Sequence, residues 1–151
     1  MLTALDYHAP VPAGWQSRAP SSSMRLAEYV VPGRDGGAGA EVVVYFFGAG
    51  QGGSVDANLA RWRGQFSNPD GGPVAEKITR ETSGAFPVTI AEWRGSYARG
   101  VGAGGAPRPD HMLVAAVVET PKGALFFQLF GPKGAVEPQV ASYLSMVKAL
   151  K

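Results

Sequence analysis

The chain has 151 residues, 45% of them hydrophobic, which is enough for one globular domain with its own core. The 14 Lys and Arg against 12 Asp and Glu residues give a formal net charge of +2, without the basic cluster that nucleic-acid binding requires, so we expect no nucleic-acid partner. The sequence has no Cys, which excludes disulfides, and no apolar run approaches the roughly 20 residues of a membrane span.

The first part of the chain, residues 1–23, is rich in Pro, Ser and Ala and predicts an extended lead-in to a single domain at 24–151. Tyr7 and Trp15 are its large apolar side chains. Met1 to Leu5 are followed by Asp6, without the basic start and apolar core of a signal peptide. As given, the sequence predicts a soluble cytoplasmic protein. A periplasmic protein or lipoprotein whose signal had been trimmed would look the same.

Six segments have the alternating or continuous apolar pattern of β-strands, bounded by Gly and Pro turns. They are 24–31, 41–47, 76–82, 88–93, 112–119 and 124–130. The connections between successive members are short, and the four residues at 120–123 leave no room for a parallel crossover. The pattern therefore predicts antiparallel hairpins. The fourth strand is expected to run on toward Tyr97, and the Gly/Pro-rich segment 100–110 predicts a mobile loop.

Two helices are predicted between and after these strands. The first spans 54–66, because Ser54 is a suitable N-cap and Val55, Leu59, Trp62 and Phe66 fall on one face. The second spans 137–150, with Pro138 in its first turn. Together the elements predict an α+β fold, in which an internal helix and a C-terminal helix pack on an antiparallel sheet of six or seven strands.

A glycine motif joins the strand at 41–47 to the first helix. Gly48, Gly50 and Gly53 have the G-x-G-x-x-G spacing of dinucleotide-binding loops. Such a site also needs a parallel second strand that ends in an acidic residue about 20 positions on, but Asp70 falls in a Pro/Gly turn. We therefore interpret the glycines as a tight strand-to-helix reversal. Anion binding at the helix N-terminus is the alternative.

No catalytic or metal-binding constellation is apparent. His8 and His111 are the only imidazoles, and without Cys they give no recognisable zinc spacing. Adjacent residues of a strand point to opposite faces, so Asp110 and His111 are expected to be a solvated pair rather than a catalytic one. No nucleophile motif follows the glycines. We therefore expect no catalytic residue, no metal and no cofactor.

The best candidate for a ligand site is the glycine turn with the polar and aromatic residues of the helix that follows. In this hypothesis Trp62 is a stacking wall, and the amides and Arg61 line a groove. The structural alternative places Trp62 in the core, Asn58 and Gln65 on backbone groups, and Arg61 in solvent or in an ion pair. The candidate residues are Gly50, Gln51, Gly52, Gly53, Ser54, Asn58, Arg61, Trp62 and Gln65.

Three stretches resemble a family of uncharacterised bacterial proteins: 22–29, 50–62 and 126–132. Members of that family often have Lys where this chain has Gln128, so the resemblance does not imply an essential cation there. The order of elements also resembles the PsbP-like fold, whose members mostly act as assembly or binding modules. This resemblance implies a non-catalytic binding or assembly module with a protein partner. The alternative is a small-molecule, nucleotide or phosphate-binding protein that uses the glycine turn.

Overall fold

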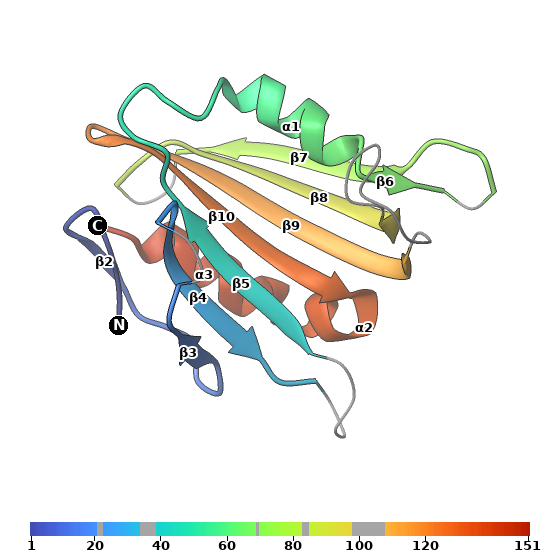
Figure 1. The fold of residues 1–151 in the computed structure, drawn as a ribbon, viewed down its shortest axis with the longest axis horizontal. Coiled ribbons are helices and arrows are strands. Elements are labelled where there is room, and N and C mark those ends of the chain that lie inside the picture. The colour runs from blue at the N-terminus through green and yellow to red at the C-terminus, as the bar shows by residue number, and fades with distance from the viewer. Residues whose placement is uncertain (21–22, 34–38, 69, 83–84, 98–107) are drawn as a thin grey trace.

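The computed structural model describes residues 1–20, 23–33, 39–68, 70–82, 85–97 and 108–151. Within these residues, one large antiparallel sheet lies between helix α1 on one face and helix α3 on the other (Figure 1). A small two-stranded sheet at the N-terminus packs beside α3. The predicted α+β class, with an antiparallel sheet and two packed helices, is therefore confirmed.

The large sheet has eight strands. They are β3 (Gln16–Arg18), β4 (Arg25–Val31), β5 (Ala40–Tyr45), β6 (Phe66–Ser67), β7 (Ala75–Glu81), β8 (Val88–Tyr97), β9 (Arg108–Thr120) and β10 (Gly123–Pro132). Their order is β3-β4-β5-β10-β9-β8, and β7 and β6 pair with successive parts of β8 at the far edge. Every pairing is antiparallel, so the three predicted hairpins β4–β5, β7–β8 and β9–β10 are confirmed.

The strands β3 and β6 are additional to the six that the sequence predicts. They contain three and two residues, which is too short for an alternating pattern to be recognised. The predicted mobile loop 100–110 lies mostly outside the described residues. Its last three positions, 108–110, belong to the start of β9.

Helix α1 (Val55–Arg63) begins where the sequence predicts but ends earlier. The Ser54 Oγ accepts a hydrogen bond of 3.0 Å from the Ala57 N–H, which confirms Ser54 as the N-cap. The predicted end at Phe66 is wrong. The chain leaves the helix at Gly64, and Phe66 instead pairs with Tyr97 as part of β6. Phe66 is buried in the sheet, so an apolar residue follows Trp62 by four positions, just as it would in a longer helix.

The C-terminal helical region begins earlier than the predicted 137 and is interrupted. It consists of α2 (Lys133–Val136), a 3-10 turn (Glu137–Gln139) and α3 (Val140–Ala149). Pro138 lies in the 3-10 turn, where its missing N–H and its ring disfavour a continuous α-helix. The break redirects the chain so that α3 lies along the sheet.

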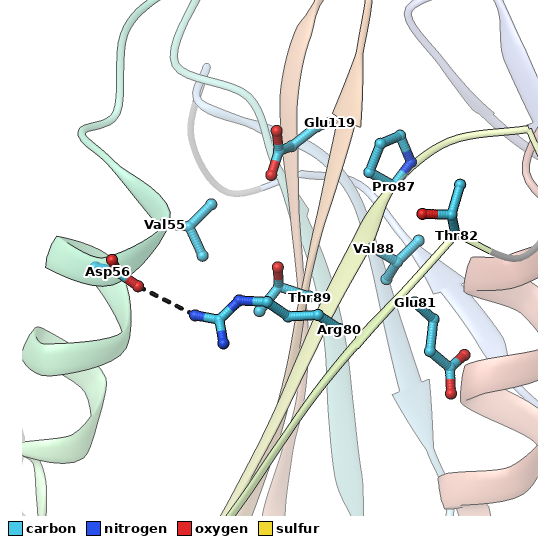
Figure 2. Close-up of a pocket in the computed structure, with 9 residues that line it drawn as sticks. All are labelled: Val55, Asp56, Arg80, Glu81, Thr82, Pro87, Val88, Thr89 and Glu119. Atoms are coloured by element: carbon cyan, nitrogen blue, oxygen red, sulfur yellow. Dashed lines mark hydrogen bonds and ion pairs between the residues drawn. The ribbon is translucent and has the colours of Figure 1, made fainter.

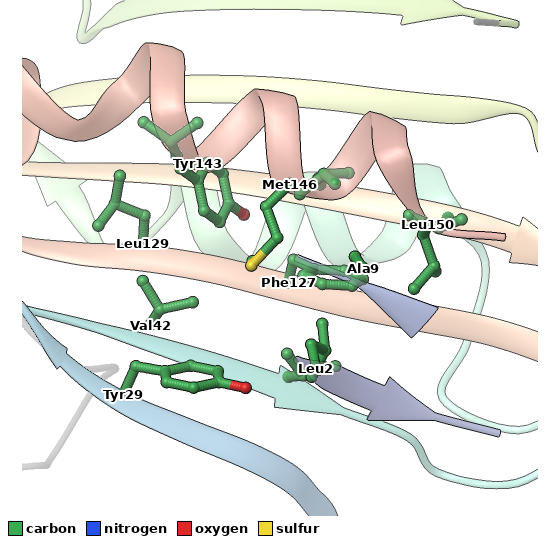
Figure 3. Packing of buried hydrophobic residues seen from close by; sticks show 14 of the residues in the cluster. Leu2, Ala9, Tyr29, Val42, Phe127, Leu129, Tyr143, Met146 and Leu150 are labelled. Atoms are coloured by element: carbon green, nitrogen blue, oxygen red, sulfur yellow. The ribbon is translucent and has the colours of Figure 1, made fainter. Parts of the chain in front are cut away.

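Two hydrophobic cores lie on opposite faces of the sheet. Under α3, Tyr143 and Met146 pack above Phe127 and Leu129 of β10, as Figure 3 shows. Under α1, a second core forms around Trp62, with Trp93 and Phe126 among its buried members. Since Phe126 and Phe127 are neighbours on β10, their side chains point to opposite faces and one strand supplies both cores.

The N-terminal residues are more fully integrated than an extended lead-in suggests. β1 (Leu2–Ala4) and β2 (Tyr7–Ala9) form a hairpin whose Leu2, Ala4 and Ala9 are buried in the α3 core (Figure 3). The backbone of His8 also exchanges two hydrogen bonds with Lys151. The larger side chains Tyr7 and Trp15 were the anchors predicted for this segment.

None of the helices that the structure describes has the length and apolarity needed to cross a bilayer.

Candidate functional site

The glycine turn between β5 and α1 is a closely packed reversal of the chain. Gly52 has φ +91°, a conformation that residues with a side chain rarely adopt. A Cβ atom at this position would lie 2.9 Å from the Phe47 ring and 3.1 Å from the Phe126 ring. Glycine is therefore required at 52 by backbone conformation and by space. This agrees with the interpretation of the motif as a structural reversal.

The surroundings of the turn differ from those of a dinucleotide site. The strand after α1 is β6, which pairs antiparallel to β8, and all described pairings of the sheet are antiparallel. Asp70 lies between β6 and β7, where its N–H donates to the Asn68 Oδ1 at 3.0 Å. Asp70, the acidic residue about 20 positions beyond the glycine motif, therefore lies in a turn, as expected from Pro69 and the neighbouring glycines.

Asn58 fastens the turn to the helix. Its side chain is buried, and its Nδ2 donates to the Gly52 carbonyl at 2.8 Å and to the Ser54 carbonyl at 2.9 Å. Its Oδ1 accepts a hydrogen bond of 2.6 Å from the Arg61 Nη2. Each polar atom of the amide is thus satisfied inside the protein. Asn58 holds the backbone, as the structural alternative predicts, and also orients Arg61.

Arg61 has a different environment from the other arginines whose side chains the structure describes. Its guanidinium lies 5.8 Å from the Trp62 ring centre, in addition to its bond to Asn58. It forms no ion pair with any described carboxylate. In contrast, five arginines each lie within 3.4 Å of a carboxylate oxygen: Arg18, Arg25, Arg63, Arg80 and Arg94. Arg61 is therefore an oriented cation without an acidic partner in the described chain.

A cavity of about 220 Å³ opens beside Arg61, between α1 and the sheet, and we call it the α1 pocket. Its polar lining residues are Arg61, Gln65 and Gln128, and its aromatic lining residues are Tyr45, Phe47, Trp62, Tyr97 and Phe126. Trp62 and Phe126 are almost completely buried and meet edge to face, with ring centres 6.2 Å apart. Tyr45 and Phe47 stack on each other at 5.9 Å. The pocket thus combines aromatic surfaces with one charge and two amides.

The amides of Gln65 and Gln128 are half-buried in this pocket. Neither amide forms a hydrogen bond to another residue that the structure describes. Most buried polar side-chain atoms in proteins do have a partner. Each amide offers both a donor and an acceptor, so the pocket presents unmatched hydrogen-bonding groups to whatever enters it.

The structure divides the predicted ligand-site residues into two groups. Arg61, Trp62 and Gln65 line the α1 pocket, whereas Asn58 lies behind it and acts through Arg61. The residues of the turn itself do not line the pocket: Gly50, Gln51, Gly52, Gly53 and Ser54.

Sequence analysis missed the sheet side of the pocket. Tyr45 is the last residue of β5 and Phe47 follows it, Tyr97 is at the end of β8, and Phe126 and Gln128 are in β10. Alternation along β10 does place Phe126 and Gln128 on one face. However, the sequence does not indicate which segment covers that face.

Two larger cavities elsewhere each contain an ion pair in their lining. Figure 2 shows one of about 330 Å³, where Arg80 lies 3.2 Å from the Asp56 carboxylate near the start of α1. Another, of about 510 Å³, has Arg18 and Glu41 in its lining, and these lie 3.3 Å apart. The arginines of these two cavities therefore have acidic partners, whereas Arg61 has none among the described residues.

The remaining chemistry-bearing residues form no metal cluster in the described part of the chain. The Nδ1 of His111 lies 2.8 Å from the Pro109 carbonyl, and its ring lies 5.5 Å from Phe130. Glu76 is an ionisable group whose pKa is shifted by its neighbours. Its pKa is lowered because Arg63 and Trp93 donate hydrogen bonds to the carboxylate. These contacts fasten β7 to β8 and α1 and lie outside the α1 pocket.

Comparison with known proteins gives a likeness at the level of fold. No protein-family model matches the sequence, and no curated protein does so either. Among solved structures, the chain is similar to LpqN of Mycobacterium tuberculosis, whose crystal structure is described as that of a protein involved in cell envelope biogenesis. The TM-score is 0.50 at 15% identity, over 95% of this chain and 78% of LpqN. At this identity the likeness shows a shared α+β architecture.

Proposed function

We propose that this protein is a non-catalytic binding module that holds a small ring-containing ligand in the α1 pocket. The observation that carries the proposal is the pair of half-buried amides, Gln65 and Gln128, which lie beside aromatic surfaces and have no hydrogen-bond partner in the described part of the chain. A bound ligand would satisfy the amides and cover the rings. Ligand sites commonly combine apolar walls with a few polar groups in this way.

The lining of the pocket supports binding rather than catalysis. Among the described residues that line it, none provides a carboxylate, an imidazole or an aliphatic hydroxyl, and the hydroxyls it has are the phenols of Tyr45 and Tyr97. Its volume of about 220 Å³ is below the roughly 300–1,000 Å³ of sites for drug-sized ligands. A single ring with its substituents is therefore a better candidate than a dinucleotide.

The alternative prediction, that the glycine turn binds a nucleotide or a phosphate, has less support. Arg61 lies seven residues after Ser54, which is roughly 10 Å along a helix. Its guanidinium lines the α1 pocket, whereas the turn does not. A phosphate at the turn would not gain the hydrogen bonds of Gln65 and Gln128.

Two resemblances are consistent with a binding or assembly role. Members of the PsbP-like fold mostly bind or assemble other components, and LpqN is involved in cell envelope biogenesis. We therefore propose the cell envelope as the compartment in which to look for the ligand. Both resemblances concern the fold alone, so the proposal depends on the pocket.

A ligand screen would test the proposal. Spectra of ¹⁵N-labelled protein would be recorded with a mixed library of neutral and charged ring compounds, including nucleotides and sugars. We expect some compounds to shift the indole N–H signal of Trp62 and not that of Trp15. Trp15 is a suitable internal control because its indole donates to Gln139 in a different part of the structure.

The matched variants are Gln128→Leu, which removes a lining amide, and Gln51→Ala, which changes an exposed amide of the turn outside the pocket. Binding should weaken in the first and persist in the second. The proposal fails if no compound perturbs Trp62, and a substrate turned over by the purified protein would contradict a non-catalytic role.

A further inference from the structure

We propose that the α1 pocket recognises a carboxylate attached to a planar ring, with Arg61 binding the carboxylate. This inference rests on the proposed function and adds the chemical class of the ligand. It begins with the charge of the site. Arg61 has no ion-pair partner among the described residues, and the lining contains no acidic side chain. A ligand with one negative charge would supply the missing partner.

Arg61 is exposed, but contacts within the protein orient its side chain in the absence of a ligand. The glycine turn holds Asn58 through the carbonyls of Gly52 and Ser54, and Asn58 in turn holds the Arg61 Nη2. The guanidinium also lies over Trp62. Because these contacts restrict the side chain in the free protein, binding costs less conformational entropy than it would for a mobile arginine.

The N–H donors of Arg61 that have no described partner match the two oxygens of a carboxylate. A guanidinium has five N–H donors, and one of them is used by Asn58 among the described residues. Its planar edge binds the two oxygens of a carboxylate in parallel. The side-chain amides of Gln65 and Gln128 supply further donors around the same pocket.

The aromatic lining supports a planar ring as the body of the ligand. Trp62 and Phe126 form a buried floor, and Tyr45 and Phe47 are half-buried beside it. Aromatic side chains favour offset-stacked or edge-to-face contacts with another ring. The volume of about 220 Å³ limits the ligand to about one such ring.

A phosphate group is a poorer match than a carboxylate. Phosphate sites in proteins commonly use the free N–H groups at a helix N-terminus. The N-terminus of α1 is not part of the pocket, and one of its N–H groups is already bound by Ser54. Arg61, which has no acidic partner among the described residues, and the planar surroundings favour a flat, singly charged anion.

The experiment uses benzoate, its neutral isostere benzamide, and inorganic phosphate. Dissociation constants would be obtained from the shift of the Trp62 indole N–H signal in spectra of the full chain. We expect benzoate to bind roughly tenfold more tightly than benzamide, since hydrogen bonds to charged groups are about twice as strong as neutral ones. Phosphate should leave the signal unchanged.

Two variants identify the source of the difference. Arg61→Gln should weaken benzoate by roughly tenfold, the contribution expected of one charge-assisted contact, while benzamide binding stays within about twofold. Arg80→Gln removes an equal charge at an exposed ion pair outside the pocket and should change neither constant. Thermal unfolding of both variants checks that they are folded.

The outcomes separate this inference from the proposed function. If benzoate and benzamide bind equally, or if Arg61→Gln affects them equally, the pocket binds rings but does not recognise a carboxylate, and the inference is wrong. A phosphate response as strong as that of benzoate would also overturn it. If neither ring compound binds while other library members do, only the inference fails. If nothing in the library binds, both fail.

Discussion

The face of the sheet under α3 and the face under α1 bury their side chains differently. Under α3, Phe127, Leu129 and Tyr143 form a continuous apolar core that the N-terminal hairpin extends (Figure 3). Under α1, a helix of nine residues covers part of the sheet, and the α1 pocket remains at its edge. The first face stabilises the fold, whereas the second combines a smaller core with unmatched polar groups.

Because of this difference, we expect substitutions under α3 to affect stability and substitutions in the α1 pocket to affect binding. A residue of the α3 core is surrounded by other apolar atoms, so its loss leaves a void. A pocket residue such as Gln128 already borders open space.

Phe127→Ala should destabilise the protein most. The Phe127 side chain is fully buried at the centre of the α3 core, and truncating such a ring costs about 3–5 kcal/mol. Denaturant unfolding followed by circular dichroism measures this loss. Gln128→Leu, the neighbouring position on the pocket side, should change the free energy of unfolding by less than about 1 kcal/mol. Equal losses would contradict the contrast between the faces.

Asn58→Ala should affect both stability and the pocket. It leaves the carbonyls of Gly52 and Ser54 without their side-chain donor, which should cost about 1–3 kcal/mol in the free energy of unfolding. It also releases Arg61, so benzoate binding should weaken even where the protein remains folded. Unfolding and binding measurements together test this dual role. Gln51→Ala is the control in the same turn and should leave both quantities unchanged.

Tyr143→Phe should be neutral or stabilising, by up to about 1 kcal/mol, although it alters the α3 core. The Tyr143 hydroxyl is fully buried and forms no hydrogen bond to any residue that the structure describes, and this desolvation raises its pKa well above the usual value. Replacing it with hydrogen removes an unsatisfied polar atom and keeps the ring. A thermal or denaturant midpoint clearly below that of the wild type would show that the hydroxyl contributes to the native state.

The pH dependence of stability should include a small contribution from Glu76. Its pKa is lowered in the folded protein because Arg63 and Trp93 donate hydrogen bonds to its ionised form. A lowered pKa in the folded state means that the stabilisation is present above the ordinary value of 4.5 and is lost as pH falls through the folded value. The pair is partly exposed, so the effect should stay below about 1 kcal/mol.

Comparing Glu76→Gln with the wild type at pH 7 and at pH 3 measures this contribution. The variant should be less stable than the wild type at pH 7, and the difference should shrink at pH 3. A difference that grows on acidification would contradict the assigned direction of the pKa change.

Much of the fold could be predicted because its signals are local. The apolar patterns of β5 and β10, the Ser54 cap and the tight turn at 120–123 each depend on a few consecutive residues. The end of α1 was misjudged because Phe66 keeps the helical apolar spacing while pairing in a sheet. The burial of Leu2 and Ala9 was missed because a three-residue strand carries almost no periodicity.

The antiparallel α+β architecture, the helix start at Ser54 and the candidate residues Arg61, Trp62 and Gln65 could all be predicted from the amino-acid sequence. That these three residues meet Tyr45 and Gln128 around one cavity, and that Arg61 pairs with none of the described carboxylates, became apparent from the folded structure. The physical reason is that turns and caps depend on neighbours in the chain. A pocket depends on which face of the sheet a helix covers, and side chains far apart in the sequence settle that by packing together.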